Sequence, residues 1–232
     1  ARDFLLLAQA HYRMGDYVAV VVALDGIQAN GLKLEVQQLH QALALYYRAG
    51  AYEQCENILK QLLKVEVDNP ENWHQLASVY LQQNKQKQAL DHLNLAFEKR
   101  VPFTESELLL LVDLQAVSGN PYGAAMTLQN AIAQDAVSAD AVNQRKLFEL
   151  WLQARERDKA KAALVTAAQI SGDTELYLYL AQLQMEEEEW VPVQSTLLEA
   201  CEERLQDRFV SRANLLLGVS LLKQDRAPEA RR

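Results

Sequence analysis

Hydrophobic residues recur along this chain at a long and nearly constant period. The clearest column is a leucine whose successive members are separated by 35, 34, 35, 36 and 33 residues. They are Leu24, Leu59, Leu93, Leu128, Leu164 and Leu197. A period of this length predicts a solenoid, in which each repeat is one supersecondary unit stacked on its neighbours.

Two further columns accompany the leucines. Four residues before each leucine stands a small or modest apolar side chain: Val20, Cys55, Ala89, Ala124, Ala160 and Val193. Three residues after it stand Ile27, Leu62, Ala96, Ala131, Ala167 and Ala200. Positions i, i+4 and i+7 share one face of a helix, so the columns predict the buried face of a helix in every unit. The small side chains allow a second helix to approach closely.

That second helix precedes the columns. Its own apolar stripe is clearest in the third unit, where apolar residues follow the i, i+3, i+4, i+7 pattern of an amphipathic helix. The stripe consists of Trp73, Leu76, Ala77 and Tyr80. Each unit is therefore expected to be a pair of helices.

Capping residues support the same boundaries. Asn69 and Pro70 offer an N-cap followed by a proline in the first turn, and Thr104 with Glu107 forms a capping box. Gly15, Gly50, Asn84 and Gly119 stand where the first helices should end, and glycine or asparagine suits a left-handed terminating residue. Arg155, Glu188 and Asp225 occupy that place in later units, where we expect longer or differently closed turns.

The sequence thus predicts an all-α fold, an α-solenoid of tandem antiparallel helix pairs that forms one domain over residues 1–232. The expected repeats lie near 1–32, 36–68, 70–102, 104–137, 140–172 and 174–207, with a truncated seventh over 210–232. Because this seventh unit stops early in its second helix, we expect the chain to be a fragment of a longer one.

The composition limits the kinds of partner that the chain is expected to bind. The formal net charge is −8, from 31 acidic and 23 basic residues, and no cluster of Lys and Arg could follow a phosphate backbone, which argues against nucleic acid. No apolar run approaches the roughly 20 residues that a membrane-spanning helix needs. The first ten residues lack the pattern of a signal peptide.

No set of residues suggests catalysis, a cofactor or a metal. Cys55 and Cys201 form no Cys-x-x-Cys pair and fit small core positions, slightly better in a reducing compartment. His40 and His74 lie one repeat apart on separate helices, too far for shared ligation. The run 186–189 of four glutamates lacks calcium-loop spacing and is expected to be a solvated helix end. We therefore expect a non-enzyme without cofactors.

The repeat resembles the tetratricopeptide (TPR) consensus. The matching positions are Trp73, Leu76, Ala77, Tyr80, Ala89, Leu93 and Ala96 in the third unit, and Leu7, Ala8, Tyr12, Gly15, Asp16 and Tyr17 in the first. The resemblance implies a right-handed superhelix whose first helices line a concave groove. Phe148 departs from it, because a small residue is usual at that place.

A fainter resemblance is to the periplasmic TPR proteins associated with bacterial TonB systems. It rests on Asn72-Trp73, Gln75-Leu76, Ala89-Leu90 and Leu93, then on Gly119-Asn120-Pro121, Ala124-Ala125 and Leu128. It implies an accessory role in outer-membrane iron uptake and a periplasmic location. Without it, a cytoplasmic location is the alternative.

Transferred by position, the TPR resemblance places the partner-binding groove on named residues. The groove residues expected to bind are Tyr12, Arg13, His40, Tyr47, Arg48 and His74. Tyrosine and arginine are common interface anchors, so we expect an extended or helical protein segment with an acidic or aromatic portion near the first two units. In the alternative interpretation the tyrosines pack within helix pairs and the arginines are solvated.

These observations leave three alternative functions. The first is a non-catalytic scaffold that binds a protein or peptide segment in its groove. The second is the recognition arm of a larger enzyme, such as a transferase, whose catalytic domain lies elsewhere. The third is a self-assembling solenoid, because an exposed terminal apolar helix can pair with a second copy.

Overall fold

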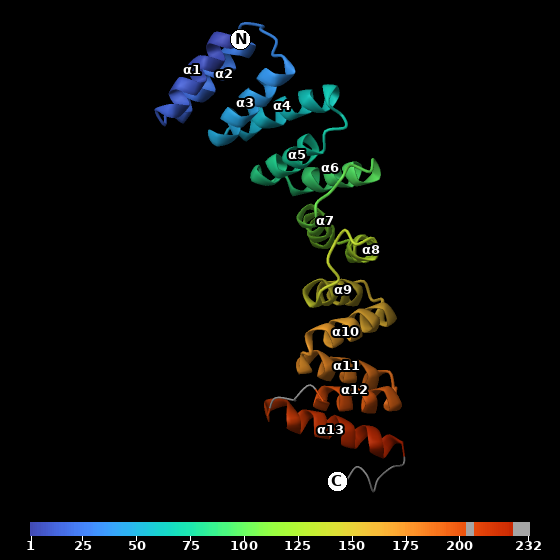
Figure 1. The fold of residues 1–232 in the computed structure, drawn as a ribbon. Coiled ribbons are helices and arrows are strands. Elements are labelled where there is room, and N and C mark those ends of the chain that lie inside the picture. Colours follow the sequence, from blue (N-terminus) through green and yellow to red (C-terminus); the bar gives the residue numbers. More distant parts are fainter. Residues whose placement is uncertain (203–206, 225–232) are drawn as a thin grey trace. The chain divides into compact units, whose positions relative to one another are not determined.

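The computed structural model describes residues 1–202 and 207–224, with the backbone alone at 201, 202, 207 and 208. These residues form thirteen α-helices and no strand (Figure 1). The helices are α1 Arg2–Arg13, α2 Tyr17–Ala29, α3 Val36–Arg48, α4 Tyr52–Val65, α5 Pro70–Gln82, α6 Gln86–Glu98, α7 Glu105–Val117, α8 Pro121–Ala133, α9 Ala141–Gln153, α10 Arg157–Ser171, α11 Thr174–Glu186, α12 Trp190–Glu202 and α13 Asp207–Lys223.

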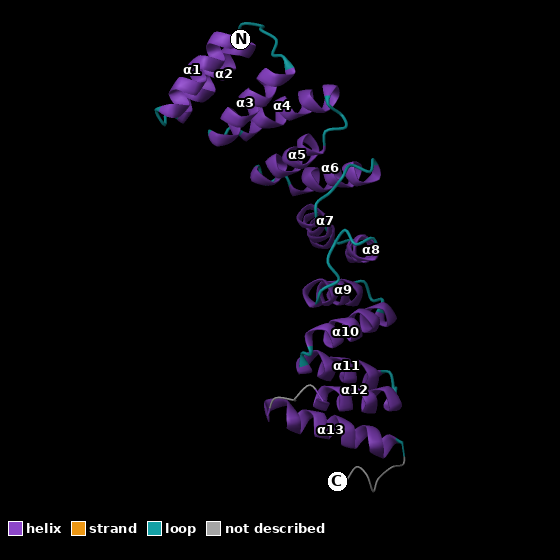
Figure 2. Ribbon diagram, in the orientation of Figure 1, coloured by secondary structure: helices purple, strands orange, loops and turns teal. Residues whose placement is uncertain are grey.

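Contacts divide the chain into two compact units, Ala1–Leu114 and Gln115–Arg232. Within unit 1, α1 packs on α2, α3 on α4 and α5 on α6; within unit 2, α9 packs on α10 and α11 on α12. Short loops join the members of each pair (Figure 2). The predicted all-α architecture of tandem helix pairs is confirmed. The predicted repeat limits and the single continuous domain stay predictions, and residues 225–232 of the seventh unit lie outside the described residues.

The three sequence columns form the core. Every leucine of the first column is at most 2% exposed, and every member of the small column is fully buried. The third column is also buried, with Ala131 the most exposed at 6%. Removing this apolar surface from water supplies most of the driving force for pairing the helices. Cys55 belongs to this core as predicted, whereas the side chain of Cys201 lies outside the described residues.

The turns inside the helix pairs share one geometry. Gly15, Gly50, Asn84 and Gly119 have positive φ, as predicted. Arg155 and Glu188 also have positive φ, at 62° and 58°, so the prediction of differently closed turns is wrong for both. In all six turns the next residue donates its N–H to a carbonyl five residues earlier at 2.8–3.0 Å, the bond of a Schellman motif. Asp225 lies outside the described residues.

Both predicted caps are present. The Asn69 side chain accepts from the N–H of Glu71, and Pro70 opens α5. The Glu107 carboxylate accepts from the N–H of Thr104 at 2.7 Å, and the Thr104 hydroxyl accepts from the N–H of Glu107 at 3.4 Å. These bonds satisfy backbone donors that a helix start would otherwise leave open.

Charged pairs join successive repeats at one equivalent place. In unit 1, Lys85 donates to Glu56 at 2.9 Å, and Gln83 donates to the same oxygen at 3.2 Å. Burial alone would raise the pKa of Glu56, but the hydrogen bonds from Lys60, Lys85 and Gln83 outweigh it and lower the pKa to about 2.

In unit 2 the signs are exchanged. Lys161 stands three residues before its column leucine, as Glu56 does, and it donates to Glu187 and, at 3.0 Å, to Glu189. Glu189 occupies the place that Lys85 has in unit 1. The expectation that the glutamate run is merely solvated is therefore wrong for Glu187 and Glu189, because Lys161 binds both.

A glycine at position 155 should stabilise unit 2. The left-handed conformation costs a residue with a Cβ roughly 1–2 kcal/mol, and glycine avoids this cost. Part of the resulting stabilisation is lost because glycine increases the conformational entropy of the unfolded chain. We expect Arg155→Gly to raise the free energy of unfolding by about 0.5–1 kcal/mol in urea titrations. Gly119→Ala should lower it, and a stabilising effect there would contradict the assignment.

Reversing one charge between repeats should be costly, and restoring complementarity should repair it. Lys161→Glu places a third carboxylate beside Glu187 and Glu189, and we expect it to lower the free energy of unfolding by about 1–2 kcal/mol. The triple variant Lys161→Glu, Glu187→Lys, Glu189→Lys should recover most of the loss in urea unfolding. Equal stability of the single and triple variants would contradict the pairing.

Candidate functional site

Two adjoining cavities open on unit 1, and we call them together the unit 1 groove. The first measures about 520 Å³ and is lined by α3 and α5; the second measures about 530 Å³ and is lined by α5, the loop after α6 and the start of α7. The two cavities share Glu71, Gln75 and Ser78 on α5. Of the predicted binding residues, His40, Tyr47 and Arg48 line the first cavity and His74 the second.

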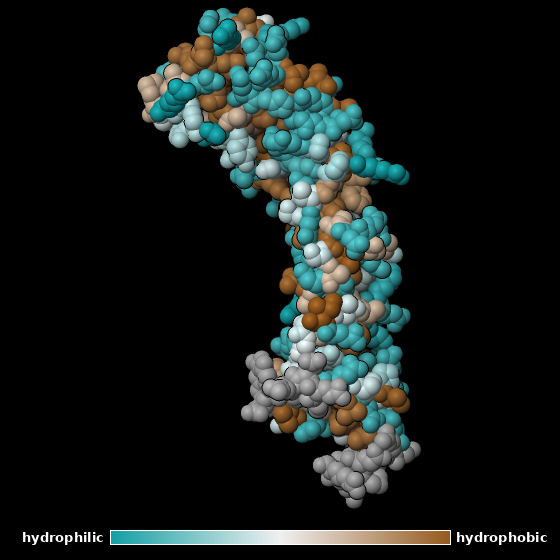
Figure 3. Space-filling view, viewed as in Figure 1, coloured by the Kyte–Doolittle hydropathy of each residue, from teal (hydrophilic) through white to brown (hydrophobic). Residues whose placement is uncertain are grey.

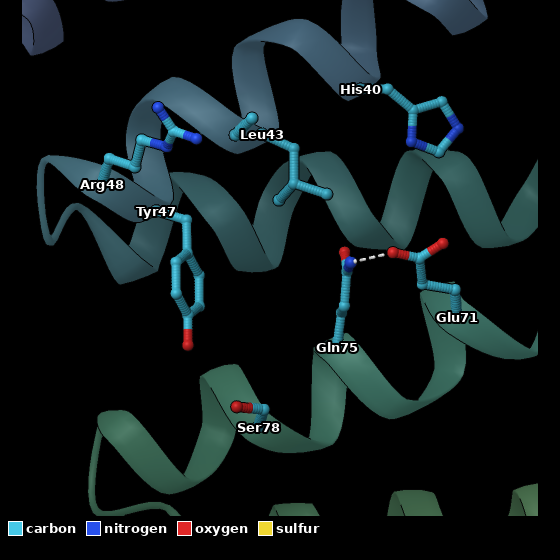
Figure 4. A pocket seen from close by; sticks show the side chains of 8 residues that line it. His40, Leu43, Tyr47, Arg48, Glu71, Gln75 and Ser78 are labelled. Carbon is cyan, nitrogen blue, oxygen red and sulfur yellow. Dashed lines mark hydrogen bonds between the residues drawn. The ribbon is translucent and has the colours of Figure 1, made fainter. Parts of the chain in front are cut away.

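The first cavity has a mixed lining (Figure 4). Leu43 lies at its centre on α3, and the Tyr47 ring extends from α3 toward Ser78 on α5. Arg48 and His40 lie at opposite ends of the α3 side, and Glu71 lies at the same end as His40. Apolar floor and convergent polar groups are the usual make-up of a recognition site.

Arg48 is held in place by Tyr12. Its Nη1 donates to the Tyr12 hydroxyl at 2.9 Å, and its guanidinium carbon lies 5.1 Å from the centre of that ring. Both residues remain at the surface, and the contact crosses from α3 to α1. Stacking on the aromatic ring orients the guanidinium group. Because an arginine has five N–H donors, some of them remain for a further ligand. Arg13 is exposed and lines neither cavity.

The tyrosines also pack within their own helix pairs, as the alternative interpretation expected. Tyr12 contacts Tyr17 with ring centres 6.0 Å apart, and Tyr47 contacts Tyr52 at 5.7 Å. The two interpretations are therefore compatible, because one face of Tyr12 supports the helix pair while its hydroxyl and ring position Arg48.

His40 and His74 each bind the loop that leads into the next helix pair. His40 Nε2 lies 2.8 Å from Glu66, whose carboxylate also accepts from Asn72 at 3.1 Å. Hydrogen bonds from Asn72 and then from His40 lower the pKa of Glu66. His74 Nε2 lies 2.8 Å from the carbonyl of Pro102.

The second cavity depends on this anchoring. The His74 ring stands edge-on to Phe103 with ring centres 4.6 Å apart, and its Nε2 lies 3.5 Å from Glu107. Phe103 in turn packs on Phe97 at 5.9 Å. The loop after α6 is thereby fixed against α5 and forms one wall of the groove.

Sequence reasoning missed part of the lining. It did not place Glu71, Gln75 or Phe103 in the groove. Glu71 and Gln75 could have been found, because Glu71, Gln75 and Ser78 lie at i, i+4 and i+7 on one face of α5. Nothing in the local sequence of Phe103 indicates that its loop folds back on the preceding first helix.

A further cavity of about 340 Å³ lies in unit 2 between α9, α11 and α13. Its lining includes Arg145, which is 3.3 Å from Glu149, and the exposed Arg212 of α13. Phe148, the departure from the TPR consensus, is buried there edge-on to Tyr179 at 5.5 Å.

No metal or membrane site emerges from the described residues. Within residues 1–202 and 207–224, no group of three or more His, Cys, Asp or Glu side chains could hold a metal ion. No helix among the described residues has the length and hydrophobicity needed to cross a membrane.

Comparison with known proteins identifies the fold. No family model matches the chain, and no curated protein matches it. Solved structures do match. A chain of the Naa15/Naa10 structure bound to HypK-THB is 18% identical with a TM-score of 0.61, covering 99% of this chain and 35% of that one. This chain therefore spans about a third of that chain's length.

Two further structures are named for their repeats. A tetratricopeptide repeat protein from Parabacteroides merdae is 15% identical with a TM-score of 0.50, covering 99% of this chain and 88% of that one. YrrB, described as a TPR protein with an unusual peptide-binding site, is 13% identical with a TM-score of 0.52, covering 82% and 96%. This chain has the TPR fold. The TPR resemblance stated from the consensus positions is thus confirmed for the fold.

The TPR helix pair that carries the groove should be sensitive to acid through His92 on α6. The ring stacks on Trp73 of α5 with centres 4.8 Å apart, and Nε2 lies 3.1 Å from the Trp73 carbonyl. Burial lowers the pKa of His92, so below pH about 6.5 the unfolded chain takes up the proton more readily than the folded one.

We therefore expect the free energy of unfolding to decrease more steeply in the wild type than in His92→Gln as the pH is lowered from about 7.5 to about 5.5. Urea titrations followed by circular dichroism would measure it. Parallel pH profiles of the two proteins would contradict the assignment to His92.

Proposed function

We propose that this chain is a non-catalytic protein-interaction scaffold that binds a segment of a partner protein in the unit 1 groove. The observation that carries the proposal is the arginine held by Tyr12 beside a cavity with an apolar floor. Tyr12, Tyr47 and Arg48 are of the residue types that dominate binding energy at protein interfaces. A cavity of several hundred Å³ accommodates a few side chains of an inserted segment.

The TPR fold supports this proposal without identifying the partner, because one fold hosts many functions. YrrB is described as having a peptide-binding site. Arg13, which follows Tyr12 at the end of α1, is a second exposed cation, and an acidic portion of the partner would complement it together with Arg48.

A second candidate is a recognition arm within a larger assembly. The observation that favours it is the match to the chain from the Naa15/Naa10 complex bound to HypK-THB, which covers nearly all of this chain but about a third of that one. In this alternative the groove has the same role, and further parts of a longer protein or complex act on what it holds.

Two sequence predictions stay open. The TonB-associated role in outer-membrane uptake rests on the fainter sequence resemblance alone. Self-association was predicted through the exposed terminal helix, and Val210, Leu215 and Leu222 of α13 are 39–66% exposed. Exposed apolar side chains also lie over α1 and α2 (Figure 3), among them Leu6, Leu7, Val18 and Val22.

Filling the first cavity should weaken binding. Ala44 is exposed and lines this cavity, so Ala44→Trp would occupy it without disturbing the core. Peptides selected from a random display library against residues 1–232 should bind this variant at least about tenfold more weakly, measured by fluorescence anisotropy. The double variant Arg13→Glu, Arg48→Glu should also weaken the binding of those selected peptides that are acidic.

The matched control is Ala133→Trp, which alters an exposed alanine lining a different cavity in unit 2. It should leave the selected peptides bound as in the wild type. If no peptide is enriched, or if peptides bind the Ala44→Trp variant unchanged, the scaffold proposal for this groove is wrong.

A further inference from the structure

The first cavity of the unit 1 groove carries opposite charges at its two ends. Arg48 lies at one end of the α3 side, and Glu71 of α5 lies at the other end beside His40 (Figure 4). Both charged side chains are exposed. A segment lying across the cavity therefore meets a cation at one end and an anion at the other.

Each of the two charges is oriented by a neutral neighbour and is not cancelled by an opposite charge. Tyr12 accepts a hydrogen bond from Nη1 of Arg48, and Gln75 donates to one carboxylate oxygen of Glu71 at 2.8 Å. Among the residues that the structure describes, neither Arg48 nor Glu71 forms an ion pair. The other guanidinium nitrogens and the second carboxylate oxygen are available to a ligand.

The space between the charges suits an apolar side chain and an extended backbone. Leu43 and Ala44 supply apolar surface, and Tyr47 supplies an aromatic wall. Ser78 and Gln75 add a hydroxyl and an amide. An extended segment has unpaired backbone groups that such side chains can satisfy, whereas a helix already pairs its own.

The register of the repeats sets the distance between the charges. Glu71 stands in α5 where Gln37 stands in α3, and Gln37 precedes Arg48 by eleven residues. At 1.5 Å per residue this is roughly 16 Å along the helix axis. An extended chain covers roughly 3.3–3.6 Å per residue, so about five residues separate groups that reach both ends.

We propose that the groove selects an extended segment with an acidic residue and a basic residue about five positions apart on either side of a large apolar residue. The acidic residue binds Arg48, the apolar residue lies over Leu43 and Ala44, and the basic residue binds Glu71. This inference rests on the proposed function, because it specifies the kind of segment that the same site holds.

Three synthetic peptides test the charge pattern. Each is a capped ten-residue peptide with a central Leu and two charged residues five positions apart: Glu with Lys, Glu with Glu, or Lys with Lys. At low salt the wild-type chain should bind the Glu with Lys peptide about three- to tenfold more tightly than the others, measured by NMR titration. Glu71→Lys should shift the preference to the Glu with Glu peptide, and Arg48→Glu to the Lys with Lys peptide.

The control reverses two exposed charges away from the cavity, Lys64→Glu on α4 and Glu98→Lys on α6, and it should leave the order of affinities unchanged. Equal binding of the three peptides by the wild type, or an unchanged order in both groove variants, overturns the charge-pattern inference while the scaffold function stands. Absence of binding by all three overturns the inference, and the selected display peptides then decide the scaffold function separately.

Discussion

Close approach of the two helices within each pair is the constraint on which the structure depends. The side chains at the point of approach, Val20, Cys55, Ala89, Ala124, Ala160 and Val193, are fully buried. No larger residue fits there without separating the helices, because protein interiors are packed as densely as organic crystals. The approach fixes where the opposite face of each first helix lies, and in unit 1 that face carries the groove.

Much of this architecture could be predicted from the sequence because it repeats. Three columns at helical spacing, recurring six times, define the buried face of each second helix without knowledge of any long-range contact. The turns show where such reasoning fails. Residue preference suggested that Arg155 and Glu188 would close their turns differently, yet the backbone hydrogen bond of the motif is the same in all six. The tertiary contacts of the paired helices outweigh a strain of about 1–2 kcal/mol.

The groove was predicted less completely, and for a physical reason. Register placed His40, Tyr47, Arg48 and His74 on the side of their helices that lines the two cavities, because helical periodicity is local information. The partners that hold them are not local: Glu66 and Pro102 lie 26 and 28 residues along the chain from His40 and His74. Those contacts depend on how each loop enters the next repeat, which no pattern within one unit specifies.

The exchange of charge between Glu56 with Lys85 and Lys161 with Glu189 bears on how the chain avoids misassembly. Repeats with nearly identical columns could stack in the wrong order, since their apolar faces are interchangeable. Docking the third repeat on the fifth would bring Lys85 against Lys161, and docking the sixth on the second would bring Glu189 against Glu56. Like charges at a partly buried contact disfavour both errors. The charged contacts between repeats thus favour the correct stacking order, which the apolar core alone does not specify.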